Sequence, residues 1–301
     1  MVHLSLGIEV FVWKLDQLGS TNRRLPELND DFKARGIKFA DSRRQRDHRT
    51  HACLSRKHPV MKHTTRPKRI GMIVPSSNTC LEPQSYRILD GRDDVTIHSA
   101  RIPVTRIGTD AGADKQFDIE GMRHAAELLA TADVDVIAWN GTSGSWLGPG
   151  HDRAIATGIT AATGIPATTS TLAYFDAFTD FDIQSIGLIT PYTQDVNEKV
   201  ITQYSKEGIR VAGHRFLGLC DNESFARVAP EELIPGSLEH APDHPDALIY
   251  LCTNLYGAPI VEDLEERTQV PILDSVAVTL WRCLQLAGIP LLHRRWGRLL
   301  G

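Results

Sequence analysis

The sequence contains no apolar run long enough to cross a membrane. None of its apolar stretches approaches the ~20 residues that a helix needs to span a bilayer. Of its 301 residues, 42% are hydrophobic and 23% are charged, which is typical of a soluble globular protein. We therefore expect no membrane partner, and a cytoplasmic location as the default.

Paired cysteines and nucleotide-binding loops are also missing. The five cysteines are an odd number, lie far apart and form no CxxC pair, which argues against a disulfide framework and a structural zinc site. Histidines such as His98, His151 and His214 show no ligand spacing, so we predict no metal. Neither GxGxxG nor GxxxxGKS/T occurs, which disfavours nucleotide binding.

The charges are distributed unevenly along the chain. Residues 1–69 hold 16 Lys and Arg against 7 Asp and Glu, a balance of +9, whereas the remaining residues have a balance of −13. Residues 41–69 are basic and have few apolar residues, so they cannot bury enough apolar surface to fold alone. We predict that residues 1–68 form a basic, disordered extension, or an upstream segment that a start at Met61 or Met72 would omit.

A basic segment of this kind also fits a nucleic-acid-binding arm, because clustered Arg and Lys attract phosphates. No aromatic platform or recognised binding module accompanies the charge, so we expect no nucleic-acid partner. A second basic segment, residues 287–301, is predicted to be a short tail, to which the sequence assigns no function.

From Arg69 onward, short apolar runs alternate with amphipathic stretches. The run RIGMIV (69–74) is stopped by Pro75, and VDVIAW (134–139) is followed by a loop of small residues; both are typical of buried strands. Between them, residues 118–132 carry apolar side chains at helical spacing. A strand, a helix and a second strand in this order predict a parallel sheet with right-handed crossovers.

The same landmarks recur in the second half of the sequence. In each half, a Gly is followed four residues later by Pro, and an Asp that opens an apolar strand is followed seven residues later by Thr. The pairs are Gly71/Pro75 and Asp135/Thr142, then Gly187/Pro191 and Asp246/Thr253. This internal duplication predicts an α/β protein with two similar lobes, each a short parallel sheet flanked by helices, related by a pseudo-two-fold axis. We expect the lobes at residues 69–167 and 168–286, with the closing helix packed back on the first lobe.

The matched strands also predict where a ligand binds. Ligands of open α/β sheets bind beyond the carboxyl ends of the strands, so the loops after the matched strands are expected to face one cleft. These loops are Pro75–Thr79, Gly141–Ser145, Pro191–Tyr192 and Cys252–Asn254. We therefore predict an active site between the lobes.

Five short motifs occur in order: PSSNTCLEP (75–83), GTSGS (141–145), PYTQDVNE (191–198), DNESFARV (221–228) and CTNL (252–255). Together they resemble the maleate isomerase/arylmalonate decarboxylase family of the aspartate/glutamate racemase superfamily. The resemblance implies a two-lobed enzyme that uses no metal or organic cofactor. It also implies a catalytic cysteine at the end of one matched strand in each lobe.

The resemblance places the second cysteine on Cys252, whereas the first position falls on Gly141. Arylmalonate decarboxylase has the same arrangement of glycine and cysteine. Asn78 and Asn222 instead match carboxylate-binding asparagines of maleate isomerase, and Tyr192 matches a pocket tyrosine of both enzymes. The chain thus combines an isomerase-like pocket with a decarboxylase-like cysteine arrangement.

Decarboxylation of a malonate leaves an enediolate, whose charge must be stabilised and whose carbon must be protonated on one face. Thr142, Ser143 and Tyr192 are expected to supply hydroxyl donors. Cys252 is expected to be the proton donor, as a partly exposed thiol where a strand meets a loop. The expected substrate-binding residues are Pro75, Ser76, Asn78, Gly141, Asn222 and Thr253.

Several of these residues also have a purely structural explanation. Cys252 fits a buried core cysteine, because free cysteine is among the most buried residue types. Thr142 and Ser143 fit ordinary turn residues. Asn78 fits a cap of the following helix, and Asn222 fits the start of another.

The function we expect is a cofactor-independent decarboxylase of a substituted malonate or another small dicarboxylic acid, with Cys252 donating the proton. The alternative is a maleate cis-trans isomerase or an Asp/Glu-type racemase, in which Cys80 or water replaces the missing first cysteine. A second alternative is an inactive homologue that binds carboxylates. Gly141→Cys is expected to create racemase activity. The sequence leaves open whether the chain forms a homo-oligomer.

Overall fold

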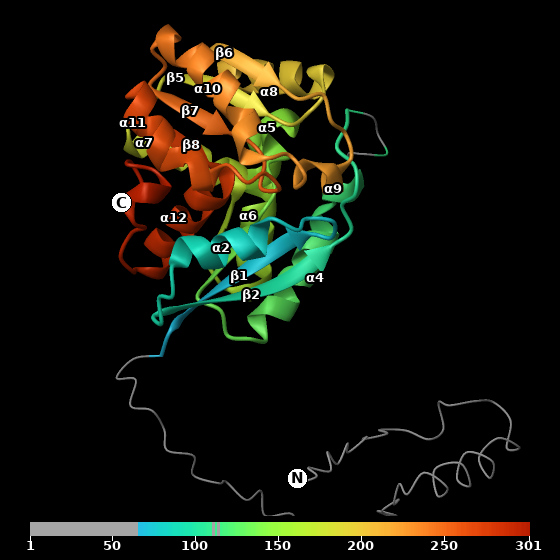
Figure 1. The fold of residues 1–301 in the computed structure, drawn as a ribbon. Coiled ribbons are helices and arrows are strands. Elements are labelled where there is room, and N and C mark those ends of the chain that lie inside the picture. Colours follow the sequence, from blue (N-terminus) through green and yellow to red (C-terminus); the bar gives the residue numbers. More distant parts are fainter. Residues whose placement is uncertain (1–65, 110–111, 113–114) are drawn as a thin grey trace, which may run out of the picture. The chain divides into compact units, whose positions relative to one another are not determined.

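The computed structural model describes residues 66–109, 112 and 115–301. The predicted basic extension, residues 1–68, therefore lies almost wholly outside the described residues. Figure 1 shows two α/β lobes in the described part, one coloured blue to green and the other yellow to red. None of the helices there is long and apolar enough to cross a membrane.

The first lobe is built on a four-stranded parallel sheet with the strand order β2-β1-β3-β4. Its strands are β1 (Lys68–Pro75), β2 (Val95–Ile102), β3 (Val136–Trp139) and β4 (Ala167–Thr169). Its helices are α2 (Leu81–Leu89), α4 (Ile119–Ala130), α5 (Gly144–Leu147), α6 (Pro149–Thr163) and α7 (Ser170–Asp180), with a 3-10 turn η3 (Lys115–Phe117). The predicted helix between the first two buried runs is confirmed as α4.

The second lobe repeats this plan with the parallel strand order β6-β5-β7-β8. Its strands are β5 (Ser185–Thr190), β6 (Arg210–Phe216), β7 (Ala247–Tyr250) and β8 (Ile272–Asp274). Its helices are α8 (Gln194–Lys206), α9 (Asn222–Phe225), α10 (Ile234–His240), α11 (Val261–Thr268) and α12 (Ser275–Ala287). Its 3-10 turns are η4 (Pro230–Leu233), η5 (Ala241–Asp243), η6 (Ala258–Ile260) and η7 (Arg294–Trp296). The two sheets have the same topology, so the predicted two-lobed α/β fold is confirmed.

The repeated sequence landmarks have matching structural roles. The central strands are buried on both faces, as parallel strands covered by helices are. A Cβ at Gly71 would lie 3.1 Å from Val134 Cγ2, and one at Gly187 only 2.4 Å from Leu248 Cδ2. A neighbouring side chain thus lies close to the glycine at the same point of β1 and β5, and it would have to shift to admit a Cβ.

The repeated aspartates fix the starts of these two strands. The Asp135 carboxylate accepts a 2.8 Å hydrogen bond from the backbone N–H of Arg69, at the start of β1. The Asp246 carboxylate accepts a 2.8 Å bond from the N–H of Ser185, at the start of β5. Each lobe thus uses one carboxylate to tie its two central strands together.

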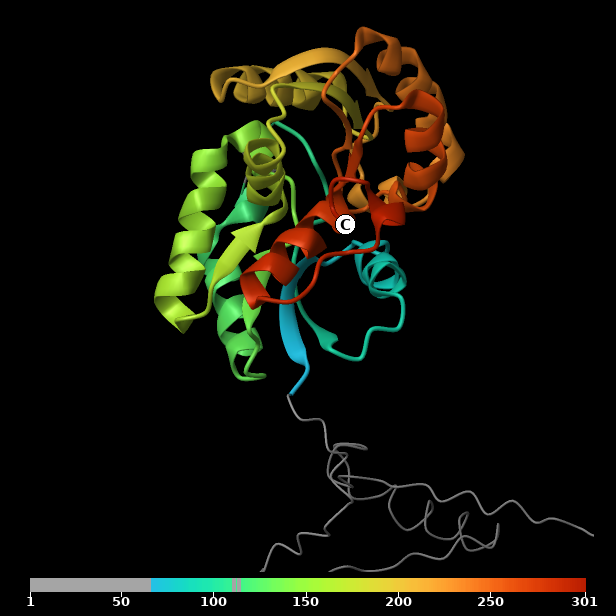
Figure 2. The same ribbon diagram turned by 90° about the vertical axis from the view of Figure 1, so that its left-hand side faces the viewer.

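The lobes meet along the last long helix, α12, and in loops at the strand ends. Helix α12 follows β8 of the second sheet, but it packs against α2, β3, β4 and α7. Figure 2 shows α12, in red, lying beside the blue and green elements of the first lobe. The predicted boundary between residues 167 and 168 falls inside β4, so the first sheet extends to Thr169.

Residues 287–301 are packed rather than free, although the sequence predicts a tail. Trp296 and Leu300 are buried, and η7 lies against α11. The backbone N–H of Arg298 donates to the Glu265 carboxylate at 3.0 Å. The same carboxylate accepts from the N–H of Ile272 at the start of β8, so this segment closes the second lobe.

Candidate active site

Strands β3 and β7 occupy equivalent places in the two sheets. They end at Trp139 and Tyr250, which pair with equivalent residues of β1 and β5. Gly141 and Cys252 each follow two residues after the strand end. The equivalence of Gly141 and Cys252 inferred from sequence landmarks is therefore present in the strand register.

Backbone and side-chain hydrogen bonds hold Cys252 in place. Its N–H donates to Ser275 Oγ at 3.0 Å, at the first turn of α12. Its sulfur accepts a hydrogen bond from the N–H of Asn254 at 3.3 Å. The Tyr192 hydroxyl also hydrogen bonds with the thiol. The sulfur therefore faces donors from the loop that follows β5 and from its own loop.

The expectation that the Cys252 thiol is partly exposed is wrong. The residue is 3% exposed, because loops of both lobes cover the end of β7. Burial raises the thiol pKa to about 12, although the Asn254 N–H and the Tyr192 hydroxyl lower it. The thiol is therefore protonated at neutral pH, a state in which it can donate a proton but not act as a nucleophile.

Thr142 and Tyr192 join the two lobes beside this thiol. Their hydroxyl oxygens lie 2.7 Å apart, and both side chains are buried. Burial raises the Tyr192 pKa well above its usual value, and the nearby Cys252 raises it further. The phenol therefore stays neutral and can donate a hydrogen bond.

Ser143 lies in the same loop as Thr142, with aromatic rings around it. The indole N–H of Trp139 donates to Ser143 Oγ at 3.4 Å. Trp146 and Phe225 pack edge-on against the Tyr192 ring, with centroids 5.4 and 5.5 Å away. The hydroxyl groups of this loop thus lie in mainly aromatic surroundings.

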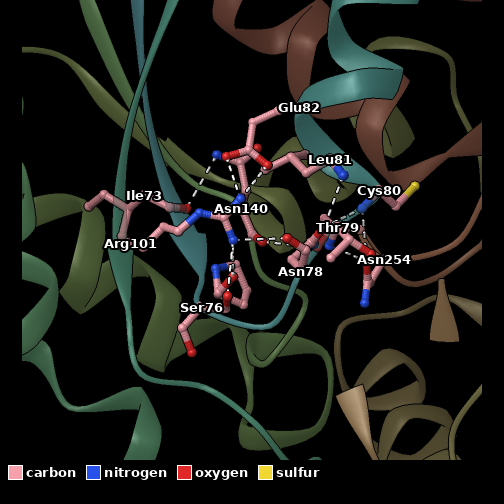
Figure 3. A network of polar contacts seen from close by, with 12 residues as sticks. Ile73, Ser76, Asn78, Thr79, Cys80, Leu81, Glu82, Arg101, Asn140 and Asn254 are labelled. Carbon is pink, nitrogen blue, oxygen red and sulfur yellow. Dashed lines mark hydrogen bonds and ion pairs between the residues drawn. The ribbon is translucent and has the colours of Figure 1, made fainter. Parts of the chain in front are cut away.

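Asn78 connects the first-lobe loop to the second lobe. Its side-chain N–H₂ donates to Thr253 Oγ1 at 3.2 Å, and the Thr253 hydroxyl donates to the Asn140 carbonyl at 3.0 Å. Its side-chain oxygen accepts from the N–H groups of Cys80 and Leu81 at the start of α2, as the capping explanation predicts. Figure 3 shows the Asn78 side chain beside Cys80 and Leu81.

Asn222 and Asn254, both from the second lobe, hydrogen bond with the loop that leads into α2. The Asn254 side-chain oxygen accepts from the N–H groups of Thr79 and Cys80, each at 3.1 Å, and its N–H₂ donates to the Asn222 carbonyl. The Asn222 side chain donates to Ser77 Oγ at 2.8 Å. Asn254 belongs to the CTNL motif and to a loop that was predicted to face the cleft, but no role was predicted for it.

Pro75 and Ser76 begin the same loop, at the carboxyl end of β1. Ser76 Oγ accepts from the N–H of Val104 at 3.1 Å. One guanidinium nitrogen of Arg101 donates to the Ser76 carbonyl at 3.0 Å and to the Asn78 carbonyl at 2.9 Å. The other pairs with Glu82, as Figure 3 shows. No local motif indicated Arg101, because its partners lie more than 15 residues away in the sequence.

Cys80 has a buried thiol that is hydrogen bonded to a backbone carbonyl. Its side chain is fully buried at the start of α2, and its thiol donates to the Leu255 carbonyl at 3.1 Å. Burial, and the negative charge of Asp274, raise the Cys80 pKa. The structure therefore disfavours Cys80 as a substitute for the missing first cysteine.

Two buried carboxyl groups lie behind the loops of the site. Asp274 caps α12 by accepting from the N–H groups of Val276 and Ala277, at 2.9 and 3.1 Å. Asp152 accepts from the Thr169 hydroxyl, and it fills the space that a side chain at residue 144 would need. Burial raises the pKa of each carboxyl group to about 7.

Asp152→Asn is expected to change the pH dependence of stability. The folded-state pKa is raised, so the folded state keeps its proton while the unfolded state loses it between about pH 4 and 7. Stability therefore falls across this window, by up to about 4 kcal/mol at pH 7. The variant should match the wild type near pH 4, become increasingly more stable than it up to about pH 7, and keep that advantage at higher pH, measured as Tm against pH.

Asp246→Asn is the control, because its stability relative to the wild type is expected to change with pH in the opposite direction. Burial of Asp246 acts to raise its pKa, but the N–H groups of Gln184 and Ser185 outweigh it, so the pKa is lowered. The wild type should gain stability over that variant as the pH rises toward about 4, and the difference should then stay constant at higher pH. Parallel curves for Asp152→Asn and the wild type would contradict the assignment of a raised pKa to Asp152.

No group of three His, Cys, Asp or Glu side chains that could hold a metal ion occurs among residues 66–109, 112 and 115–301. The polar atoms around Cys252 belong to hydroxyl, amide and backbone groups. Such a site can bind carboxylates through hydrogen bonds and can move one proton at the thiol.

Comparison with known proteins gives consistent matches. A profile of the arylmalonate decarboxylase family matches residues 70–300. Arylmalonate decarboxylase of Bordetella bronchiseptica is 28% identical over 223 residues, covering 73% of this chain and 90% of that protein. Maleate isomerase of Geobacillus stearothermophilus is 29% identical over 230 residues, covering 72% and 90%.

Solved structures of both enzymes have the same fold. A maleate isomerase from Pseudomonas putida aligns with a TM-score of 0.71 at 25% identity, covering 78% of this chain and 98% of that one. A liganded double mutant of arylmalonate decarboxylase aligns with a TM-score of 0.69 at 26% identity, covering 77% and 98%. The named relatives are thus enzymes that decarboxylate or isomerise small carboxylic acids. The chain belongs to the arylmalonate decarboxylase family.

Proposed function

We propose that the chain decarboxylates a substituted malonate-type acid without a cofactor, and that Cys252 protonates the resulting enediolate. The proposal is supported by one observation: two positions that are equivalent in the two lobes carry different residues. After β7 stands a thiol, Cys252, whereas after β3 stands Gly141, which has no side chain. One proton donor suffices for decarboxylation, but two-base racemisation needs a group on each face of the carbon.

The reaction proceeds in two steps. The bond between the α-carbon and one carboxylate breaks, CO₂ leaves, and the electron pair is delocalised over the remaining carboxylate as an enediolate. The Cys252 S–H then gives its proton to the α-carbon and becomes a thiolate. The thiolate takes a proton from solvent, so one solvent proton is consumed for each CO₂ released.

The protonation state of Cys252 supports its role as the donor. With a pKa raised to about 12, it enters the reaction as a thiol. Attack on a double bond or removal of an α-proton would require a thiolate at the start. The thiolate left after donation is stabilised by the N–H of Asn254 and the hydroxyl of Tyr192.

The remaining assignments follow the positions of the donors. Thr142, Ser143 and Tyr192 stabilise the charge of the enediolate, because their hydroxyl groups lie in buried surroundings where hydrogen bonds to an anion are strong. The side chains and backbone around the retained carboxylate come from both lobes. They are Pro75, Ser76, Asn78, Gly141, Asn222 and Thr253.

Isomerisation of maleate is the second candidate. Asn78 and Asn222 both lie at this site, and the chain is as similar to a maleate isomerase as to the decarboxylase. A water molecule would then replace the nucleophile that Gly141 lacks, because the Cys80 thiol is buried and bonded to a carbonyl.

One assay separates the candidate functions. The protein is incubated in D₂O with phenylmalonate or with maleate, and CO₂, fumarate and deuterium at the α-carbon are measured. We expect CO₂ from phenylmalonate and one deuterium at the α-carbon of the product. Fumarate from maleate without CO₂ would support the isomerase instead. Binding of either acid with no turnover would show an inactive carboxylate-binding homologue.

A further inference from the structure

We propose that Trp139 closes the face of the site opposite Cys252 and so restricts the enzyme to one-sided proton transfer. This inference rests on the proposed function. It names Trp139 as the residue that limits the enzyme to proton transfer on one face.

The indole ring of Trp139 occupies the space that a side chain at residue 141 would enter. A Cβ built on Gly141 lies 2.3 Å from Cζ2, 2.4 Å from Cε2 and 2.8 Å from Nε1 of that ring. Contacts below 3.0 Å essentially never occur for a real Cβ. The backbone of Gly141 does not have a positive φ, so the ring, and not the local conformation, excludes a side chain.

Packing and a hydrogen bond hold the indole ring of Trp139 in place. Trp139 is fully buried, its N–H donates to Ser143 Oγ, and the Phe117 ring packs against it with centroids 6.4 Å apart. Rotation of the indole would break the Ser143 contact and open a cavity in a closely packed core. The indole ring of Trp139 therefore cannot move away from Gly141 without a loss of stability.

The equivalent residue of the second lobe behaves differently. Tyr250 ends β7 as Trp139 ends β3, but its hydroxyl bonds with Ser237 Oγ at 2.8 Å on α10. Cys252 consequently has room for its side chain beside Tyr192. The two lobes thus differ twice, at the position of the thiol and at the aromatic residue two positions before it.

This geometry revises the expectation that Gly141→Cys alone creates racemase activity. Racemisation requires a cysteine introduced at position 141 to take the α-proton as a thiolate, while the Cys252 thiol delivers its proton to the opposite face. The new cysteine can be introduced only if the indole is made smaller. Trp139→Leu removes the three ring atoms that the new Cβ would meet, and Trp139→Met offers a flexible side chain of intermediate volume.

The first test measures stability, which does not depend on any activity. Gly141→Ala is made in the wild type and in the Trp139→Leu and Trp139→Met backgrounds. We expect it to lower Tm by about 5 °C or more in the wild type and by much less in either background. The control is Gly121→Ala, where a Cβ meets nothing within 4 Å, so no loss is expected. Equal losses in all backgrounds, or none in the wild type, would overturn the assignment.

The second test measures the change in specificity. One enantiomer of 2-phenylpropionate is incubated in D₂O with Gly141→Cys and with Trp139→Leu/Gly141→Cys, and deuterium uptake and loss of optical purity are followed. We expect the double variant to exchange at least about tenfold faster than the single variant, which is one decade in rate. Equal exchange in both variants, or none in a folded double variant that still releases CO₂ from phenylmalonate, would overturn the inference. If the wild type releases no CO₂, the proposed function fails, and the stability cycle still decides whether Trp139 blocks residue 141.

Discussion

Cys252→Ala is expected to lower the kcat for CO₂ release by about 10³-fold, the range found when a positioned general acid is removed. The enediolate would still form, but only water could protonate it, and loops of both lobes cover the end of β7. The loss should appear in kcat rather than in KM, because the thiol acts after the substrate is bound. Steady-state CO₂ release with phenylmalonate measures it.

Cys283→Ala is the matched control for this prediction. Cys283 is also a fully buried cysteine whose pKa burial raises to about 12, but it lies in the interior of α12. Its replacement should cost a similar amount of stability and leave kcat unchanged. More than about a tenth of wild-type kcat in a folded Cys252→Ala variant would refute the role of Cys252, since a general acid contributes at least about 10².

Tyr192→Phe is expected to lower kcat by about 10²-fold, a typical cost of removing one preorganised donor to an oxyanion. The phenol is bonded both to Thr142 and to the Cys252 thiol, so its loss weakens the stabilisation of the enediolate and of the thiolate. The pKa of Cys252 should rise further, because the Tyr192 hydrogen bond lowers it. Turnover and the pH dependence of thiol alkylation measure the two effects.

Tyr204→Phe separates catalysis from packing. Tyr204 is also fully buried, and its hydroxyl bonds with Ser145 Oγ at 3.0 Å, away from the thiol. Its replacement should lower Tm with little effect on kcat, whereas Tyr192→Phe should affect kcat by far more than its change in Tm explains. Similar losses of kcat in both variants would point to general loosening of the fold.

The strands and their duplication were predictable because each landmark acts within one lobe. Side chains of the same lobe lie close to Gly71 and to Gly187, and the two aspartates bind the strands next to them. Such requirements recur at fixed spacing in each repeat, so the sequence displays them. The same reasoning located the loops that carry Asn78, Thr142 and Cys252.

The burial of Cys252 and the obstruction by Trp139 were not predictable in this way. The end of β7 is covered by residues contributed by the other lobe, whose approach no local pattern specifies. Whether the indole of Trp139 turns toward Gly141 depends on Ser143 and Phe117, which come together only in the fold. The sequence shows that residue 139 is a tryptophan, but it does not show that its indole ring points toward Gly141.

The side-chain amide of Asn254 connects the two lobes through hydrogen bonds. It lies two residues after Cys252, accepts from the N–H groups of Thr79 and Cys80 at the start of α2, and donates to the carbonyl of Asn222. One side chain near Cys252 thus joins three separate segments of the chain, so its replacement by Ala is expected to weaken the contact between the lobes at this point.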